Sequence, residues 1–580
     1  MINMVQNAKD QAAALAMAAY QAAVADGTLP QAEVKTAPVE IPKDTANGDF
    51  TTTFALAASK ALRQPPRNIA QALLDHMDLA GSYFASAEIA GPGFLNFRLN
   101  DSWYAAVCEA VESEGAGYGT ADHLKGQKIM VEFVSANPTG PMHMGNARGG
   151  VLGDTLASVL AACGADVTRE FYVNDAGHQI DKFAHSIEAR YLQIIRGEDA
   201  VPFPEDGYQG EDIKDLARAY YEKNGDKLLD VPEAERQEAL AQFGLSINLP
   251  KMKTDLERYK IHYDNWFYES SLHESGYVKE TVDLLAERGW TYEKDGALWL
   301  RTADILRDHY RRQGKKEADI EKLDLKDDVL RRANGFYTYF AADIAYHRNK
   351  FARGFDTCID VWGADHHGHV ARMKGAMDAV GLKGDHLQVV LIQLVRLMRD
   401  GEVVRMSKRS GKAIQLADLL DEVPVDAARF FFNLREAGTR MDFDLDLAIE
   451  QSASNPVYYV QYAHARICSI FKALAADGVV SRPCSGEELR LLAEPEEKEL
   501  IRHLAAYTGE IVAAAKAYDP ARITRYCMEL ATLFHKFYNA CRVKGTEEPL
   551  MQARLALCSA TRLTLRNALS LLKIDAPEAM

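Results

Sequence analysis

Two polar residues three positions apart, His143 and Asn146, follow a short apolar run and a turn rich in proline and glycine. An apolar run that leads through a turn into a helical pattern is typical of the strand–helix junctions at which open α/β sheets bind ligands. Both side chains can project from the first helical turn, where free backbone N–H groups and the helix dipole favour a phosphate group. Gly145 leaves room for an adenine ring on the backbone. A histidine that only caps a helix is the alternative, and the strand, turn and helix around His143 favour the nucleotide site.

A basic segment later in the chain, residues 405–412 (RMSKRSGK), could bind phosphate groups as well. Lysine is a compact charge on a flexible stem, so Lys408 is suited to bind a polyphosphate, with Met406 and Ser407 beside it in the ATP site. An ammonium on the oxygens that gain negative charge in nucleotidyl transfer lowers the reaction barrier. Alone, this segment would more often be a solvated surface loop. Together with the first segment it predicts an ATP-dependent enzyme.

Three histidines and a carboxylate lie close together in a third segment, residues 363–369 (GADHHGH), directly after a strand-like apolar run. Such a set suggests zinc. No cysteine pair or His-Glu-x-x-His partner accompanies it, so we expect no metal site. A glycine and a carboxylate at the end of a strand suit hydrogen bonding to a ribose or an amino group, and Gly363 and Asp365 are therefore expected in the ATP site.

Length and composition limit the classes of protein that fit these segments. A chain of 580 residues exceeds the roughly 250–300 at which one hydrophobic core stops growing, so several domains are expected. The eight cysteines are scattered singly, and no membrane-spanning stretch or signal peptide is recognisable, which indicates reduced thiols and a cytoplasmic protein. The formal net charge of -16 disfavours a polyanionic partner. Residues 501–580, however, hold eleven Lys and Arg against seven Asp and Glu, which permits nucleic acid there.

Hydrophobic periodicity indicates the elements that would position these segments. Residues 1–110 combine helical patterns with a strand-like run and predict an α+β module. Alternating strand and helix patterns over residues 122–400 predict an α/β domain with a parallel sheet, interrupted by a polar insertion at about residues 190–250. Residues 401–455 form a connecting region with the basic segment, and residues 456–580 have helical patterns alone. The expected strands are 93–99, 128–134, 167–173, 358–362 and 389–394, and the expected helices include 51–62, 68–77, 146–162, 497–517 and 553–572.

Residues 142–146 (MHMGN) and 406–410 (MSKRS) resemble the two signatures of class I aminoacyl-tRNA synthetases, usually written HIGH and KMSKS. The surrounding sequence is similar to arginyl-tRNA synthetases in particular, from about residue 48 to the C-terminus. The last histidine of HIGH is Asn146 here, and asparagine can donate a hydrogen bond but cannot become cationic, so we expect a larger share of charge stabilisation from Lys408. The other segments that carry the resemblance are 131–141 (VEFVSANPTGP), 173–177 (VNDAG), 360–366 (DVWGADH), 455–466 (NPVYYVQYAHAR) and 575–578 (DAPE).

The resemblance implies a fold, a reaction and a set of contacts. The fold would be the Rossmann-like class I catalytic core with an N-terminal tRNA-contacting module and an all-α anticodon-binding domain. The reaction would join L-arginine to tRNA(Arg) through an arginyl-adenylate made from ATP with Mg²⁺, with His143, Asn146 and Lys408 stabilising the phosphates. Whether Asp365 or His366 contacts the amino acid stays open. The residues implied to bind arginine are Glu132, Ser135, Asn137, Tyr339, Asp343 and His366.

Two of these expectations also have a physical basis in the residues. Glu132 lies inside an otherwise apolar strand, where a carboxylate is costly unless it has a partner. Tyr339 and Asp343 are four positions apart and hence neighbours on one helix face. An ordinary exposed pair on a helix is the alternative for these two.

Contacts with tRNA are implied at both ends of the chain. Asn47 and Phe50 match the spacing of D-loop contacts in the N-terminal module of the family. Tyr462 and Tyr538 are aromatic residues among basic ones and are expected to stack on anticodon bases, although an aromatic stripe on a helix is more often core. The family resemblance also implies a monomer. The alternatives for the whole chain are another class I synthetase or related nucleotidyltransferase, and a tRNA-binding paralogue without catalysis.

Overall fold

The computed structural model describes residues 2–404 and 414–580, including nearly all of the two units into which the chain divides. Met406, Ser407 and Lys408, which belong to the second signature, lie outside the described residues. One unit comprises Met1–Asp122, Pro456–Lys516 and Arg522–Met580, and the other comprises His123–Asn455 and Ala517–Ala521.

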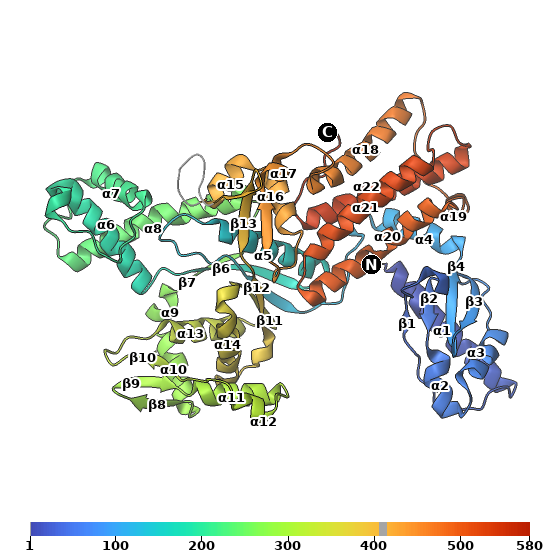
Figure 1. Ribbon diagram of the computed structural model, residues 1–580, viewed down its shortest axis with the longest axis horizontal. Coiled ribbons are helices and arrows are strands. Elements are labelled where there is room, and N and C mark those ends of the chain that lie inside the picture. Colours follow the sequence, from blue (N-terminus) through green and yellow to red (C-terminus); the bar gives the residue numbers. More distant parts are fainter. Residues whose placement is uncertain (1, 405–413) are drawn as a thin grey trace. The chain divides into compact units, whose positions relative to one another are not determined.

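A five-stranded parallel sheet is the framework of the second unit (Figure 1). Its strand order is β12-β11-β5-β6-β7, and each neighbouring pair is parallel, which confirms the predicted α/β sheet. Strand β7 was not expected, because its four residues (NWFY) are too few to show a period. The strands are β5 (Lys128–Glu132), β6 (Asp166–Val173), β7 (Asn265–Tyr268), β11 (Thr357–Gly363) and β12 (Leu387–Ile392).

Helix α5 (Met144–Ala162) follows β5 and packs closely on the sheet. This approach depends on Gly153, since a Cβ atom at this position would lie 2.3 Å from Cγ of the Phe133 ring. Interiors are close-packed, so the two elements would have to separate to accept any side chain there. The close packing fixes the start of α5, and with it His143 and Asn146, beside the end of β5.

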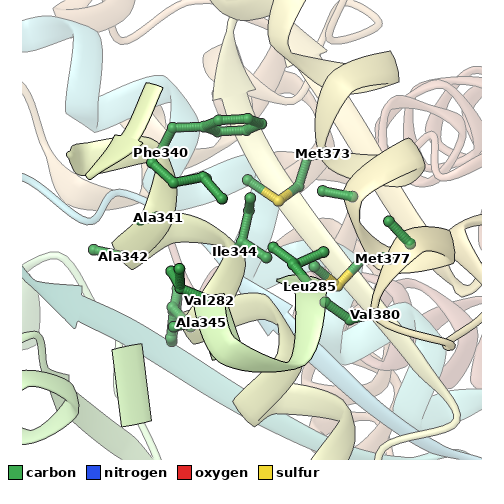
Figure 2. Packing of buried hydrophobic residues seen from close by; sticks show 14 of the residues in the cluster. Val282, Leu285, Phe340, Ala341, Ala342, Ile344, Ala345, Met373, Met377 and Val380 are labelled. Atoms are coloured by element: carbon green, nitrogen blue, oxygen red, sulfur yellow. The ribbon is translucent and has the colours of Figure 1, made fainter. Parts of the chain in front are cut away.

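A hydrophobic core joins helix α13 (Tyr339–Ala352) to helices α14 (His367–Ala379) and α10 (Tyr277–Glu287). Figure 2 shows Phe340 and Ile344 of α13 among apolar side chains from the other two helices. Because residues i, i+3 and i+4 share a helix face, this buried face leaves the adjoining face of α13 for polar residues.

Two smaller sheets complete the second unit, with strand orders β10-β9-β8 and β14-β13-β15. Their strands are β8 (Thr291–Lys294), β9 (Ala297–Leu300), β10 (Asp328–Arg331), β13 (Val395–Arg399), β14 (Glu402–Val404) and β15 (Met441–Asp444). The accompanying helices are α9 (Ser270–Glu274), α11 (Thr302–Arg312), α12 (Glu317–Ile320), α15 (Leu416–Glu422), α16 (Val425–Phe432) and α17 (Leu445–Ile449).

The insertion expected at about residues 190–250 consists of long helices with an apolar cluster of their own. Helix α6 (His178–Arg196) enters it, followed by α7 (Glu211–Asn224) and α8 (Glu233–Arg258). Helix α8 continues through Pro250, although proline removes a backbone donor and usually ends a helix.

The first unit contains an antiparallel sheet, β1-β2-β4-β3, and a set of helices. The helix expected over residues 51–62 begins later, at Phe54, because Phe50–Thr52 forms strand β2 and pairs with β4. The N-terminal elements are α1 (Met4–Ala25), β1 (Val39–Glu40), β2 (Phe50–Thr52), α2 (Phe54–Leu62), α3 (Pro66–Asp75), β3 (Phe84–Ala90), β4 (Phe94–Leu99) and α4 (Asp101–Glu114).

The C-terminal part of this unit is helical, as predicted. Across residues 2–404 and 414–580, no helix is both long and apolar enough to traverse a lipid bilayer. The C-terminal helices are α18 (Pro456–Ala476), α19 (Gly486–Leu489), α20 (Pro495–Ala517), α21 (Ala521–Ala540) and α22 (Glu548–Leu571).

Candidate active site

The carboxyl ends of the parallel strands bring the predicted residues to one edge of the sheet. Glu132 ends β5 and Gly363 ends β11, and these strands are neighbours. The order of the strands reverses at β5, because later strands add on both of its sides. Ligands of open α/β sheets bind outside the strand ends at such a switch point.

The turn after β5 is strained. Val134 and Ser135 have φ values of 69° and 43°, a left-handed conformation that is unfavourable for a β-branched residue such as valine. Strain of this kind costs about 1–3 kcal/mol per residue and persists only where the surroundings hold it. Here the Ser135 hydroxyl donates to Glu132 Oε1 (2.8 Å) and accepts from the backbone N–H of Tyr172 (3.1 Å). The turn places Ser135 and Asn137 at the mouth of a cavity.

This first cavity, of about 640 Å³, lies at the start of α5. His143 is the exposed N-cap residue, and its backbone N–H donates to Oδ1 of Asn146 (3.0 Å). The amide oxygen of Asn146 is thereby used within the helix, and the NH₂ group is the part of this side chain that can donate to a phosphate. The lining residues are Val134, Ser135, Ala136, Asn137, Thr139, Gly140, Pro141, His143, Asn146, Gln179, Tyr208, Gln209, Gly210, Asp212 and Gln415.

The chain that follows the second signature also reaches this cavity. Gln415 lines it and forms an isolated antiparallel bridge with His143. The first signature is therefore paired with residues that directly follow the undescribed stretch 405–413.

A second cavity, of about 510 Å³, begins next to the first. Gln179 lines the first cavity, and the preceding residue, His178, lines the second. Burial raises the pKa of Tyr339, while the nearby backbone N–H groups of these two residues act in the opposite direction. The lining residues are Ala176, Gly177, His178, Asp181, Glu269, His273, Arg332, Asn334, Gly335, Phe336, Tyr337, Thr338, Tyr339 and Ala342.

The charges of two carboxylates, Glu269 and Asp343, both act on the hydroxyl of Tyr172. Burial raises the pKa of Tyr172, and the carboxylates of Glu269 and Asp343 raise it further. Glu269 is 3% exposed, and the side chain of Asp343 is 38% exposed. Two carboxylates beside one aromatic hydroxyl form a setting that favours a cation with several N–H donors.

Sequence reasoning missed Glu269. It follows directly on β7, the strand that was not expected, and a carboxylate at the end of a parallel strand was the signal that could have revealed it. His273 Nε2 lies 3.4 Å from its Oε1.

Glu132 is buried, and the structure shows the partner that a carboxylate in an apolar strand requires. Lys350 Nζ lies 2.5 Å from Glu132 Oε2, and Ser135 donates to Oε1, so both oxygens have a donor from the chain itself. Burial raises the pKa of Glu132, and Lys350 partly offsets this effect. The guanidinium contact expected of Glu132 would have to share these oxygens.

The third segment forms the end of β11, a short 3₁₀ turn (Ala364–His366) and the start of α14. Asp365 and His366 are exposed, with His366 Nε2 3.5 Å from Asp365 Oδ2. The histidine that reaches the arginine-binding candidates is His369, whose Nε2 lies 3.5 Å from Asp343 Oδ2. No group of three or more His, Cys, Asp and Glu side chains is arranged for a metal ion within the part of the chain that the structure describes.

The four tRNA-binding candidates lie in the first unit and differ in exposure. Asn47 is exposed on a 3₁₀ turn (Thr45–Asn47), whereas Phe50 is 2% exposed and packs against Phe84. The side chain of Phe50 is therefore part of the core of the module, and a direct contact through its ring would require the core to open.

Tyr462 and Tyr538, the aromatic candidates in the C-terminal helices, both contact the side chain of Arg466. The guanidinium of Arg466 lies 5.9 Å from the ring centroid of Tyr462 and 4.8 Å from that of Tyr538. Tyr462 is 37% exposed, so part of its ring can contact a partner.

Comparisons with known proteins agree along the whole chain. Three family profiles match: "Arginyl tRNA synthetase N terminal domain" over residues 11–99, "tRNA synthetases class I (R), catalytic domain" over 109–468, and "DALR anticodon binding domain" over 460–580. The arginine–tRNA ligase of Ruminiclostridium cellulolyticum is 52% identical over 558 residues, with 96% of each chain covered. That of Acetivibrio thermocellus is 50% identical over 581 residues, with 100% of each chain covered.

Solved structures share the fold. The Thermus thermophilus arginyl-tRNA synthetase superposes with a TM-score of 0.71 at 23% identity and covers 98% of this chain and 99% of its own. The catalytic-domain profile spans more than half of the chain, and the relatives above match it at about half of all positions. The chain therefore belongs to the arginyl-tRNA synthetase family of class I aminoacyl-tRNA synthetases.

Proposed function

We propose that this chain is an arginine–tRNA ligase whose two neighbouring cavities bind ATP and L-arginine at the carboxyl edge of the parallel sheet. The observation that carries this proposal is the pairing of a cavity at a helix start with a second one lined by the buried carboxylate Glu269. A helix start favours phosphate, and carboxylates favour a guanidinium, so the two sites suit the two small substrates.

The arginine side chain enters the second cavity, where Glu269 and Asp343 accept hydrogen bonds from its guanidinium and Tyr339 covers it. The arginine backbone points to the first cavity, where Ser135 and Asn137 lie beside the strained turn. This orientation brings the carboxylate of arginine toward the phosphates of ATP. His366 remains part of the proposal as a residue at the amino-acid end, with Asp365 as its alternative.

ATP lies over the start of α5. Gly145 leaves space for the adenine ring, and Gly363 and Asp365 lie at the end of the neighbouring β11 for contacts with the ribose. His143 and Asn146 donate to the phosphates. Lys408, with Met406 and Ser407, is proposed to act on the same phosphates from the second signature.

The reaction needs no side-chain nucleophile. The carboxylate of arginine attacks the α-phosphorus, the bond to the bridging oxygen breaks, and pyrophosphate leaves with the electron pair. A ribose hydroxyl of the terminal tRNA adenosine then attacks the carbonyl carbon of the adenylate, its proton passes to a phosphate oxygen, and AMP leaves with the electron pair of the broken bond. The protein holds the reactants in line and stabilises negative charge on the phosphates, and these two effects lower the barrier.

Mg²⁺ is expected to accompany ATP and to neutralise phosphate charge when bound. It keeps several waters and usually binds through substrate phosphates with one or two carboxylates. Among the described residues that line the first cavity, Asp212 is the one carboxylate. This donor set fits an ion held mainly by ATP, with Asp212 as its protein ligand.

The macromolecular substrate is tRNA(Arg). Asn47 is proposed to contact its D-loop, with Phe50 supporting that surface from below, and Tyr462 and Tyr538 are proposed to stack on anticodon bases. A monomer in the cytoplasm completes the proposal, and size-exclusion chromatography with light scattering tests the monomer.

The discriminating experiment is ATP–pyrophosphate exchange with each of the twenty amino acids, with and without tRNA(Arg). We expect exchange with arginine and with none of the other nineteen amino acids. Exchange with a different amino acid would identify another class I synthetase. No exchange, combined with tRNA binding, would identify a paralogue without catalysis.

A further inference from the structure

One face of helix α13 carries four polar residues in succession: Tyr339, Asp343, His347 and Lys350. Their spacing of four, four and three positions places them in a single row along the helix. The exposure changes along this row. Tyr339 is 43% exposed at the second cavity, whereas His347 is 4% exposed and Lys350 is 0% exposed.

The buried end of the row is joined to the sheet by charged contacts. Lys350 Nζ lies 2.5 Å from Glu132 Oε2 on β5 and 2.7 Å from Asp360 Oδ1 on β11. Asp360, which is 0% exposed, has its other oxygen 2.7 Å from His347 Nε2. The row is therefore anchored to the two strands that meet at the switch point.

His347 makes two close polar contacts at the buried end of the row. Its Nδ1 lies 2.7 Å from the backbone carbonyl oxygen of Asp343, and its Nε2 lies 2.7 Å from Asp360 Oδ2. His347 therefore bridges the backbone of α13 and strand β11, and Lys350 is the cation that Glu132 and Asp360 share.

A buried charged cluster of this kind is sensitive to the loss of its shared cation. Removing one partner of a buried pair leaves an uncompensated charge, which is far more costly than the pair itself was favourable. If Lys350 were neutral, Glu132 and Asp360 would face each other across the space it vacates. Relief would come from movement of α13 or rotation of Glu132, and each displaces groups that lie at the arginine site.

We infer that Lys350 is a positioning residue for arginine recognition: it satisfies Glu132 from within the chain and fixes the row of α13 that presents Tyr339 and Asp343 to the ligand. This inference rests on the proposed function. It makes Glu132 a support of the site, with the Ser135 hydroxyl held at its other oxygen.

The test is a double-mutant cycle on Lys350→Met and Glu132→Gln. The measurements are the KM for arginine and the KM for ATP in ATP–pyrophosphate exchange with tRNA, together with the melting temperature. We expect Lys350→Met to raise the arginine KM by about tenfold or more and to change the ATP KM by less than about threefold, because the buried charge is at the arginine side.

Glu132→Gln alone keeps an acceptor for one donor and leaves Lys350 paired with Asp360. We expect it to raise the arginine KM by no more than about threefold, since no buried charge loses its last partner of opposite sign. The double variant removes one charge of each sign. It should recover most of the arginine KM lost in Lys350→Met, a non-additivity expected of residues in direct contact.

Arg348→Met is the matched control. Arg348 lies two residues before Lys350 on the same helix and pairs with Glu280, whose side chain is 61% exposed. Its loss also removes a long cation from α13 but leaves no buried carboxylate without a partner. The arginine KM should stay within about twofold of the wild type.

The outcomes separate the alternatives. A large rise in the arginine KM in Glu132→Gln, with a double variant equal to the product of both, would mean that Glu132 itself binds arginine and would overturn the inference. A lower melting temperature in Lys350→Met with an unchanged arginine KM would reduce Lys350 to a structural role and overturn it as well. If Lys350→Met does not fold, an arginine KM within about threefold of the wild type in both Glu132→Gln and the double variant supports the inference, and a large rise in both overturns it. A wild-type protein without arginine-dependent exchange would refute the proposed function before any variant is compared.

Discussion

The backbone N–H of Leu416 donates to the carbonyl oxygen of Met142 at 2.9 Å. A second bond, from the N–H of Met144 to the carbonyl of Ile414 at 3.3 Å, continues the same pairing. The segment that follows the second signature is thus attached to the segment of the first. A substitution in one signature is therefore expected to change the effect of a substitution in the other.

The first prediction concerns His143 and Lys408. Each single change to alanine should slow ATP–pyrophosphate exchange by about 10²–10³-fold, because each removes a donor from phosphates that gain charge in the transition state. Arginine binding, measured by calorimetry, should be nearly unchanged. Exchange rates equal to those of the wild type would remove the altered residue from this role.

The double change of His143 and Lys408 to alanine should slow exchange less than the product of the two single effects. Two groups that act on the same phosphates work as a unit, so once one is lost the other contributes less, and their contributions are not independent. Strict additivity would mean that they act on separate steps.

A second prediction uses two glycines on the same helix. Gly153→Ala should lower the stability of the protein by about 1–3 kcal/mol, the usual cost of overpacking, because the new methyl group would meet the Phe133 ring. Differential scanning fluorimetry reports the change as a lower melting temperature. The ATP KM should rise with it, since the start of α5 shifts.

Gly145→Ala is the matched comparison. No atom lies within 4 Å of a Cβ at this position, so the substitution has space in the protein. The melting temperature should stay the same or rise, because alanine is favoured over glycine in helices by up to about 1 kcal/mol. A higher ATP KM at unchanged stability would support an adenine ring at this glycine, and an unchanged ATP KM would place the ring elsewhere.

Much of the fold was predictable, because its signals are local. The apolar runs of β5, β6, β11 and β12 and the period of α5 are visible in short windows of sequence. Strand β7 was missed because four residues carry no period, and with it Glu269 was missed as a site residue. Phe50 was expected to contact tRNA from a sequence match, and its burial against Phe84 depends on the pairing of β2 with β4.

The partner of Glu132 could not be read from the sequence for a different reason. The sequence shows that a carboxylate in an apolar strand needs compensation. Lys350, which provides it, lies 218 positions away along the chain, and only the fold brings the two together. Long-range charge pairing has no local pattern, so sequence reasoning could state the requirement but not which residue meets it.

The third prediction concerns Glu269. Glu269→Gln should raise the arginine KM by about tenfold to a hundredfold, since a hydrogen bond to a charged partner is worth about 1.5–3 kcal/mol. The ATP KM should change little, because Glu269 lines the second cavity. Glu274→Gln, an exposed carboxylate five positions on, is the control and should leave both constants unchanged. An unchanged arginine KM in a folded Glu269→Gln protein would exclude it from the pocket.

The fourth prediction concerns the pH dependence of stability at Glu170. Burial alone would raise the pKa of this carboxyl, but hydrogen bonds and charge from Arg353 and a hydrogen bond from Asn265 hold it below its ordinary value. Arg353 donates to both oxygens, at 2.5 and 2.8 Å. A depressed pKa in the folded state means that Glu170 contributes stability above the ordinary glutamate pKa of about 4.3 and loses it as the pH falls toward the depressed value.

Arg353→Met reverses the sign of this contribution. Without the guanidinium, burial dominates and the pKa of Glu170 rises, so the charged form becomes unfavourable at neutral pH and protonation relieves it. We expect the variant to be less stable than the wild type by about 2–3 kcal/mol at pH 7, below the roughly 3–5 typical of a fully buried pair because Arg353 is 28% exposed. The difference in melting temperature between the wild type and Arg353→Met should shrink as the pH falls below about 5. Protonation of Glu170 then removes the stabilising ion pair from the wild type, whereas the variant has no such pair to lose. Other carboxylates titrate in both proteins and cancel in the difference.

Arg348→Met, whose partner Glu280 is exposed, should show a small and pH-independent difference over the same range. A gap between wild type and Arg353→Met that stays constant down to pH 4 would mean that Glu170 is not the group whose charge Arg353 stabilises.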